Sequence, residues 1–136
     1  MKSIGLALML LLAHQGYSME FRWGAVDEAK ADPKASKQSV IYANGAIQSG
    51  DFDRLRALLR KDFEVYIKSS RTVRITSNGG DIVEAIKIGG LLKEMYAEVV
   101  VDGDCASACF LLYVSAVERK SFGRVGIHRP YFEPRY

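Results

Sequence analysis

The chain has 136 residues, of which 49% are hydrophobic and 26% charged, and its formal net charge is +3. This composition is typical of an ordinary globular protein, and the length suits a single domain. Nucleic-acid binding is not indicated, because the net charge is small and the basic residues are scattered along the chain.

The N-terminus has the pattern of a secretory signal. Lys2 supplies a positive charge, residues 4–13 form an apolar run, and Gly16 and Ser18 are small residues just before a cut at Met19. The apolar run is shorter than the roughly 20 residues that a membrane span needs. We therefore predict export, to the bacterial periplasm, with membrane contact only through this leader if it is not cleaved. An uncleaved anchor and a buried first helix are the alternatives.

After the leader, the sequence predicts an irregular segment, then two short strands and one helix. Residues 19–38 are polar and irregular, with room for one short early strand. Residues 39–47 read as a strand, a turn at Asn44-Gly45 and a second short strand. A helix follows, because apolar residues then recur at helical spacing: Phe52, Leu55, Leu58 and Leu59.

Three further strands are predicted, at residues 63–69, 72–76 and 97–101. A long helix over residues 82–96 separates the last two, since apolar residues repeat there every three or four positions. After a turn at residues 102–104, residues 108–114 form a helix that is apolar on every side, which predicts its burial. A last strand at residues 124–128 ends before Pro130.

This alternation of strands and helices predicts an α/β domain with parallel strands. Parallel strands place their carboxyl ends at one edge of the sheet, where open α/β sheets bind their ligands. The turn at Gly79-Gly80 and the turn before Ser107 are therefore expected to open on the same side of the sheet.

Both turns allow a structural and a chemical interpretation. Gly79 and Gly80 can simply form a tight turn, or they can bring free N–H groups close to a bound anion. Ser107 can cap the apolar helix that follows it, or it can be a nucleophile. His128, the only histidine after the N-terminal leader, is the base available to such a serine.

Cys105 and Cys109 flank Ser107 and lie four residues apart. On a helix they would share a face, with Cα atoms about 6 Å apart, which is within the range of disulfides. Export favours a bond between them, because thiols outside the cytosol are usually oxidised. A metal or redox site made of both cysteines and His128 is the weaker alternative, and we predict no metal and no cofactor.

Three segments occur in the order found in the Clp protease proteolytic-subunit family: residues 75–82 (ITSNGGDI), 106–109 (ASAC) and 122–130 (FGRVGIHRP). Over roughly residues 39–131 the chain resembles exported relatives of that family within the ClpP/crotonase superfamily. The resemblance implies a ββα spiral with mainly parallel strands, shortened after the histidine strand. The expected organisation is a signal peptide, an irregular segment and a ClpP-like domain, at residues 1–18, 19–38 and 39–136.

The resemblance also implies a serine peptidase acting on peptide or protein substrates. Ser107 matches the family's nucleophile and His128 its general base, while Gly80 and Ala108 match the backbone donors of the oxyanion hole. Family members assemble into rings, so a homo-oligomer is a further expectation.

One feature of the family is missing, because its catalytic acid comes well after the histidine. The only acidic residue after His128 is Glu133, which lies between Pro130 and Pro134 and is not expected to replace that acid. The sequence therefore leaves three interpretations open: a shortened form of a longer protein, a Ser–His dyad, or an inactive binding or scaffold domain with the same fold.

Overall fold

Six strands and four helices alternate along residues 17–25 and 38–127, which are the residues that this computed structural model describes. The strands are β1 (Glu20–Ala25), β2 (Ser39–Asn44), β3 (Thr72–Ser77), β4 (Glu98–Ala106), β5 (Glu118–Ser121) and β6 (Arg124–Gly126). The helices are α1 (Asp51–Lys61), α2 (Phe63–Lys68), α3 (Ile82–Glu94) and α4 (Cys109–Ser115). The fold is thus α/β, as the sequence predicts.

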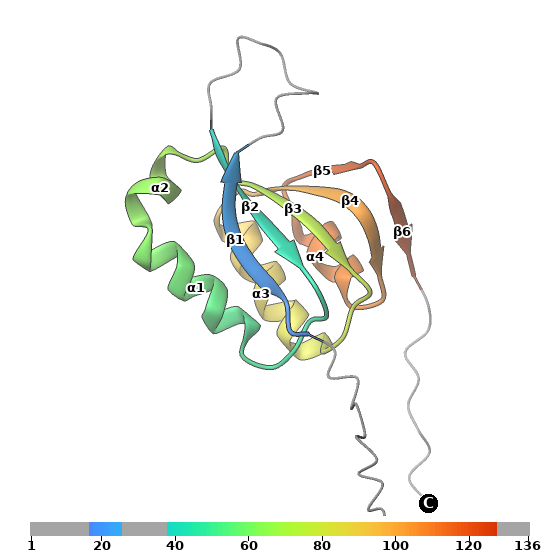
Figure 1. The fold of residues 1–136 in the computed structure, drawn as a ribbon. Helices are drawn as coiled ribbons and strands as arrows, with labels where there is room; N and C mark the ends of the chain where they lie inside the picture. Colours follow the sequence, from blue (N-terminus) through green and yellow to red (C-terminus); the bar gives the residue numbers. More distant parts are fainter. Residues whose placement is uncertain (1–16, 26–37, 128–136) are drawn as a thin grey trace, which may run out of the picture.

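The strands form one mixed, mostly parallel sheet in the order β1-β2-β3-β4-β5, with β6 also paired to β4. Only β1 runs antiparallel to its neighbour, and its arrow in Figure 1 points opposite to those of β2 and β3. The first half of β4 pairs with β5 and its second half with β6, so these two short strands follow each other along the same side of β4.

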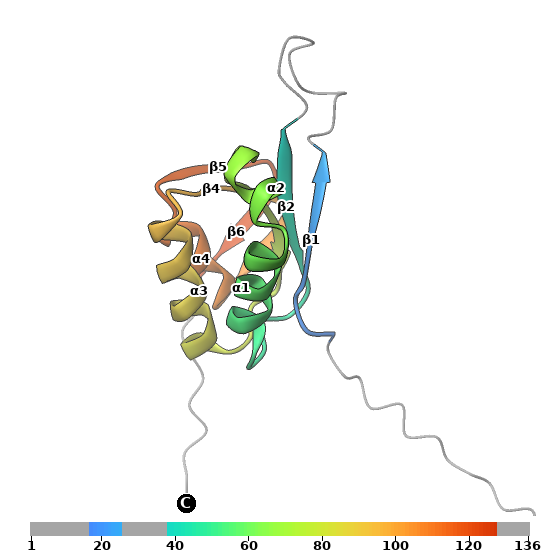
Figure 2. The ribbon, with the colours of Figure 1, turned by 90° about the vertical axis from the view of Figure 1, so that its left-hand side faces the viewer.

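Helices α1, α3 and α4 lie on the same side of β1 and β2, as Figure 2 shows. The buried core fills the space between them, because alternate residues of β3 and the apolar stripe of each helix face each other. Its largest members include Ile41, Leu55, Ile75, Ile88, Leu92, Val99, Val101 and Leu112.

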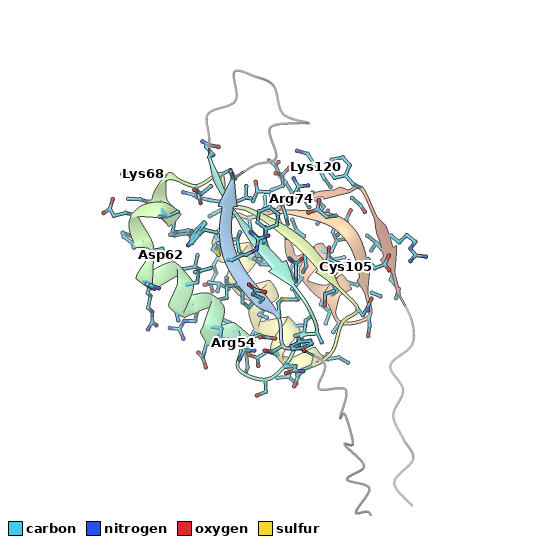
Figure 3. All side chains as sticks on the ribbon, in the orientation of Figure 1. Arg54, Asp62, Lys68, Arg74, Cys105 and Lys120 are labelled. Atoms are coloured by element: carbon cyan, nitrogen blue, oxygen red, sulfur yellow. A yellow bond between two sulfur atoms is a disulfide. The ribbon has the colours of Figure 1, made fainter. Side chains whose placement is uncertain are left out.

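Residues 102–104, predicted to be a turn, instead belong to β4. Ile75 pairs with Val101 and Ser77 with Cys105, so Thr76 alone faces three residues of β4 and the register shifts there. A bulge of this kind bends a strand without ending it. Figure 3 shows the labelled Arg74, on β3, and the labelled Cys105, on β4, at different heights along the sheet.

The two aspartates of this bulge fasten β4 to its neighbours on both sides. Asp102 accepts two hydrogen bonds from Arg74 on β3, one of them 2.8 Å long from Nε. Asp104 accepts two from Arg124 on β6, from Nε and from a terminal guanidinium nitrogen, both 2.9 Å. The charged residues that suggested an exposed turn therefore hold three strands together.

Residues 63–69 are predicted to be a strand, but Phe63–Lys68 form helix α2, which has no buried residue. A short apolar run is ambiguous between strand and helix, and here the chain continues the helical bonding of α1. The Asp62 N–H donates to Leu58 O, and the Tyr66 N–H donates to Asp62 O. Local hydrogen bonding therefore outweighs the strand propensity of Val65 and Ile67, both of which stay exposed.

The short early strand allowed within residues 19–38 is present as β1, which pairs with β2 over six residues. One other strand and one helix differ from expectation in smaller ways. β5 was not predicted, because all four of its residues are exposed and show no apolar alternation. Helix α4 buries Cys109 and Leu112 but leaves Val114 42% exposed, so the prediction of burial on every side is wrong.

The predicted signal cut falls between two residues that contact the rest of the fold just before β1. Ser18 bridges Ala46, whose N–H donates to Tyr17 O over 3.2 Å. Met19, on the other side of the cut, is only 1% exposed. Cleavage stays a prediction. Among the helices of the described residues, none has the length and apolar character needed to cross a membrane.

Candidate functional site

The carboxyl edge of the parallel strands brings successive turns of the chain into contact, as expected from the sequence. Each turn touches the next. Ser18 bridges Ala46, and Ile47, directly after Ala46, bridges Gly80. Gly79 then lies against Ser107, whose N–H donates to Gly126 O over 3.1 Å. Residues far apart in the sequence thus meet around one serine.

Ser107 has a left-handed backbone conformation, with φ of +58°. This conformation is uncommon outside glycine and is strained by of order 1 kcal/mol or more. It allows the chain to turn sharply from the end of β4 into α4. Strained residues of this kind occur often at active sites, where they present a side chain that a regular element would direct elsewhere.

The interpretation of Ser107 as a helix cap is not supported by its geometry. Ala108 is the N-cap of α4, and no side chain accepts a hydrogen bond there. The Ser107 carbonyl, rather than its hydroxyl, accepts from the Phe110 N–H over 2.9 Å. The serine is partly exposed, and within the described residues its hydroxyl has no hydrogen-bond partner.

Gly79 leaves no room for a side chain beside the serine. A Cβ placed on Gly79 would lie 2.7 Å from Ser107 Cβ, 2.7 Å from Ala106 O and 2.9 Å from Ala108 N. Gly79 also has a positive φ of +95°. Both the space and the backbone conformation therefore require glycine at this position.

Gly80 and Ala108, the expected oxyanion donors, come directly after Gly79 and Ser107 in the sequence. Gly80 is itself held tightly, because a Cβ on it would lie 2.1 Å from Ile47 O. Neither the Gly80 N–H nor the Ala108 N–H donates a hydrogen bond to any group in the described residues. Two backbone donors without partners thus belong to turns that touch at Gly79 and Ser107.

Cys105 and Cys109 form a disulfide, with their Cα atoms 5.2 Å apart. Both residues are fully buried, and the bond closes a loop around Ser107 from the last part of β4 to the first turn of α4. Neither sulfur is a thiolate here, so the cysteines do not form the alternative metal site. Within residues 17–25 and 38–127 no cluster of three or more acidic, histidine or cysteine side chains could hold a metal.

His128, the expected general base, lies outside the described residues. Gly126, two positions before it, pairs with Ala106 and accepts the hydrogen bond from Ser107. Asp104 and Arg124 hold this part of β6 in place, and the hydrogen bond from Arg124 lowers the pKa of Asp104. The described chain is thus fixed beside the serine up to the residues that precede the histidine.

Sequence reasoning missed one buried charge near the site, the carboxylate of Glu84. It lies in the first turn of α3, four residues after Gly80, and is 4% exposed. Its Oε1 accepts hydrogen bonds from the N–H groups of Phe52, at 2.8 Å, and Gly50, at 3.1 Å. The bond from Phe52 is the largest cause that lowers the pKa of Glu84, and Lys87 also lowers it. An acidic residue at a helix start usually indicates solvent exposure, so nothing in the sequence distinguished it.

A separate groove runs between the start of β1 and one face of α1. Its lining combines apolar and basic side chains, among them Phe21, Leu58, Arg54 and Lys61. Among its lining residues, Ser18 alone belongs to the series of turns that leads to Ser107.

Comparisons with known proteins do not identify a family. No protein-family model matches the chain, and no curated protein matches it at a significant level.

Replacing Gly79 by alanine tests the close approach of the two turns. We expect Gly79→Ala to lower the free energy of unfolding by about 2 kcal/mol or more, because the new Cβ meets backbone and Cβ atoms that cannot yield easily. Gly90→Ala is the matched control. A Cβ at Gly90, in α3, meets nothing within 4 Å, and we expect a gain of about 0.5–1 kcal/mol. Urea denaturation measures both, and equal small effects would contradict the packing.

The pKa of Glu84 predicts how stability depends on pH. Because the pKa is lower in the folded state, this carboxylate stabilises the fold above its unfolded pKa of about 4.3, and the contribution is lost as pH falls through the folded value. Urea midpoints of the wild-type protein and Glu84→Gln should therefore differ most near pH 7 and converge toward pH 3. A difference that is constant or grows on acidification would contradict the shift.

Proposed function

We propose that the chain is a serine peptidase-like hydrolase in which Ser107 is the nucleophile. The observation that carries this proposal is the left-handed backbone of Ser107 at the carboxyl edge of the sheet, with its hydroxyl unbonded among the described residues. Glycine would fit this turn without strain, and a strained serine at this edge of the sheet supports a chemical role.

The proposed reaction begins with the attack of Ser107 Oγ on the carbonyl carbon of the substrate, while His128 accepts the hydroxyl proton. The electron pair of the C=O bond moves to the oxygen, which the N–H groups of Gly80 and Ala108 stabilise. Collapse of this intermediate breaks the bond to the leaving amine, which takes the proton from His128. Water, deprotonated by His128, then hydrolyses the acyl ester and regenerates the serine.

The proposal assigns the general base to His128 because the chain just before it lies beside Ser107. Two residues of extended chain span at most about 7 Å, and His128 is two residues beyond Gly126, whose carbonyl oxygen is 3.1 Å from Ser107 N. A Ser–His dyad without an orienting carboxylate is expected to be slower than a full triad, although the oxyanion donors retain part of the rate enhancement.

We further propose a ClpP/crotonase-like arrangement of the ββα units. Two features support it: helices cross over between successive parallel strands β2, β3 and β4, and β4 divides its pairing between β5 and β6. An exported, periplasmic protein with peptide or protein substrates fits the leader pattern and the disulfide, because disulfides persist in oxidising compartments. A homo-oligomer remains part of this proposal.

A fluorophosphonate probe tests the proposed nucleophile, because it phosphonylates activated serines. We expect the full chain at pH 7.5 to be labelled at Ser107, Ser107→Ala to lose the label completely, and His128→Ala to label at least about 100-fold more slowly. Ser115→Ala is the control, since the Ser115 hydroxyl is occupied by a 2.6 Å hydrogen bond to Leu111 O.

Two outcomes would decide against the proposal. Labelling that persists in Ser107→Ala would show that another residue reacts with the probe. No labelling of the wild-type chain would favour the inactive binding or scaffold domain.

A further inference from the structure

Glu84 and Asp51 are two of three buried polar or charged residues in the described chain, with Ser77. Burying a carboxylate is unfavourable unless it is well hydrogen-bonded, so their partners indicate what they hold in place. Both accept hydrogen bonds from backbone N–H groups at the end of the β2–α1 connection and the start of α1, which we call the 47–52 segment after its residues.

The two carboxylates bind alternate N–H groups of the 47–52 segment. Asp51 Oδ2 accepts from the Gln48 N–H over 2.6 Å, and Asp51 also pairs with Arg54. Glu84 Oε1 accepts from the N–H groups of Gly50 and Phe52, at 3.1 and 2.8 Å. Asp51 thus acts within its own segment, whereas Glu84 reaches it from α3, more than thirty residues later in the sequence.

The other end of the 47–52 segment lies against the glycine turn. The Ile47 N–H donates to Gly79 O, and the Asp81 N–H donates to Ile47 O, both over 2.9 Å. These two bonds flank Gly80 on either side, and a Cβ on Gly80 would lie 2.1 Å from Ile47 O. The orientation of the Gly80 peptide therefore depends on where Ile47 is held.

Glu84 closes this arrangement into a ring. Its own N–H donates to Asp81 Oδ1 over 2.9 Å, which caps α3 directly after the glycine turn. Its carboxylate then returns to the 47–52 segment, whose first residue contacts Gly79 and Asp81. The backbone N–H of Glu84 thus holds Asp81, and its carboxylate holds the 47–52 segment, on the two sides of the contact that surrounds Gly80.

We infer that Glu84 is a positioning residue for the oxyanion donor Gly80, an inference that rests on the proposed hydrolase function. The carboxylate of Glu84 acts through the 47–52 segment, whose first residue, Ile47, is hydrogen-bonded to Gly79 and Asp81. Without its carboxylate, the N–H groups of Gly50 and Phe52 lose their acceptor, and the 47–52 segment is free to move away from the glycine turn. A small displacement of an oxyanion donor lowers the rate of the chemical step more than it lowers binding.

The test measures the rate at which a fluorophosphonate probe phosphonylates Ser107 in the full chain, at increasing probe concentration. This gives two quantities: the maximal rate, and the probe concentration at which the rate is half-maximal. We expect Glu84→Ala to reduce the maximal rate by about 10-fold to 100-fold, with little change in the half-maximal concentration. Glu84→Gln keeps an acceptor oxygen and should restore the rate to within about 3-fold of wild type. Glu84→Asp, which is shorter by one methylene, should fall between them, and it keeps the test valid if Glu84→Ala does not fold.

Ile88→Val is the control for lost stability. Ile88 lies on the same helix, is 1% exposed and belongs to the apolar core, so its truncation destabilises the fold without altering the ring around Gly80. All variants are measured well below their thermal midpoints, and Ile88→Val should label at the wild-type rate. A loss in Ile88→Val equal to that in the Glu84 variants would reduce Glu84 to a structural role.

The result also separates this inference from the proposed function. Wild-type labelling with an unchanged maximal rate in Glu84→Ala and Glu84→Asp would overturn the role of Glu84 while leaving Ser107 as the nucleophile. A wild-type chain that does not react would overturn both.

Discussion

The close approach of Gly79 to the turn at Ser107 is the contact on which the geometry of the candidate site depends. It joins the carboxyl ends of β3 and β4, and neither turn has room for a further side-chain atom there. The bulge of β4 makes this contact possible, because it shifts the register just before Cys105 and brings the end of the strand back beside Ser77. The serine is thus positioned by the backbone of two neighbouring strands.

Several separate interactions hold this contact in place. The disulfide closes the chain on either side of Ser107, the bond to Gly126 fixes it against β6, and the pairs of Asp104 with Arg124 and of Asp102 with Arg74 brace the bulge. On the other side, Ile47 holds the glycine turn, and two buried carboxylates hold the segment that follows Ile47. The strain in Ser107 is offset by this framework, as expected for a residue kept in an unfavourable conformation.

Much of this arrangement could be predicted from the sequence, in the segments where the pattern of apolar residues and glycines is compatible with only one kind of element. The periodicities of α1 and α3, the strand at β3 and the meeting of the Gly79-Gly80 and Ser107 turns are all present. Prediction failed where local patterns were ambiguous or where partners lay far along the chain. Residues 63–69 have strand-forming side chains but continue the bonding of α1, and β5 shows no apolar alternation.

The bulge and Glu84 could not be predicted for a different reason. Asp102, Gly103 and Asp104 have the composition of a turn, but they lie within a strand that pairs with β6 and whose aspartates bond to arginines on β3 and β6. Glu84 has the composition of an exposed helix start, and its burial depends on N–H groups of Gly50 and Phe52. In both places the deciding partner is more than fifteen residues away, which no local pattern reveals.

The most direct test of the account is mass-spectrometric mapping of the phosphonate adduct with the disulfide intact and after its reduction and alkylation. If the closed loop from Cys105 to Cys109 presents Ser107 for reaction, the adduct should form on Ser107 in the oxidised protein and fall strongly after reduction, while the fold, monitored by circular dichroism, is retained. Equal labelling of Ser107 in both forms, or an adduct on a different residue, would contradict the account.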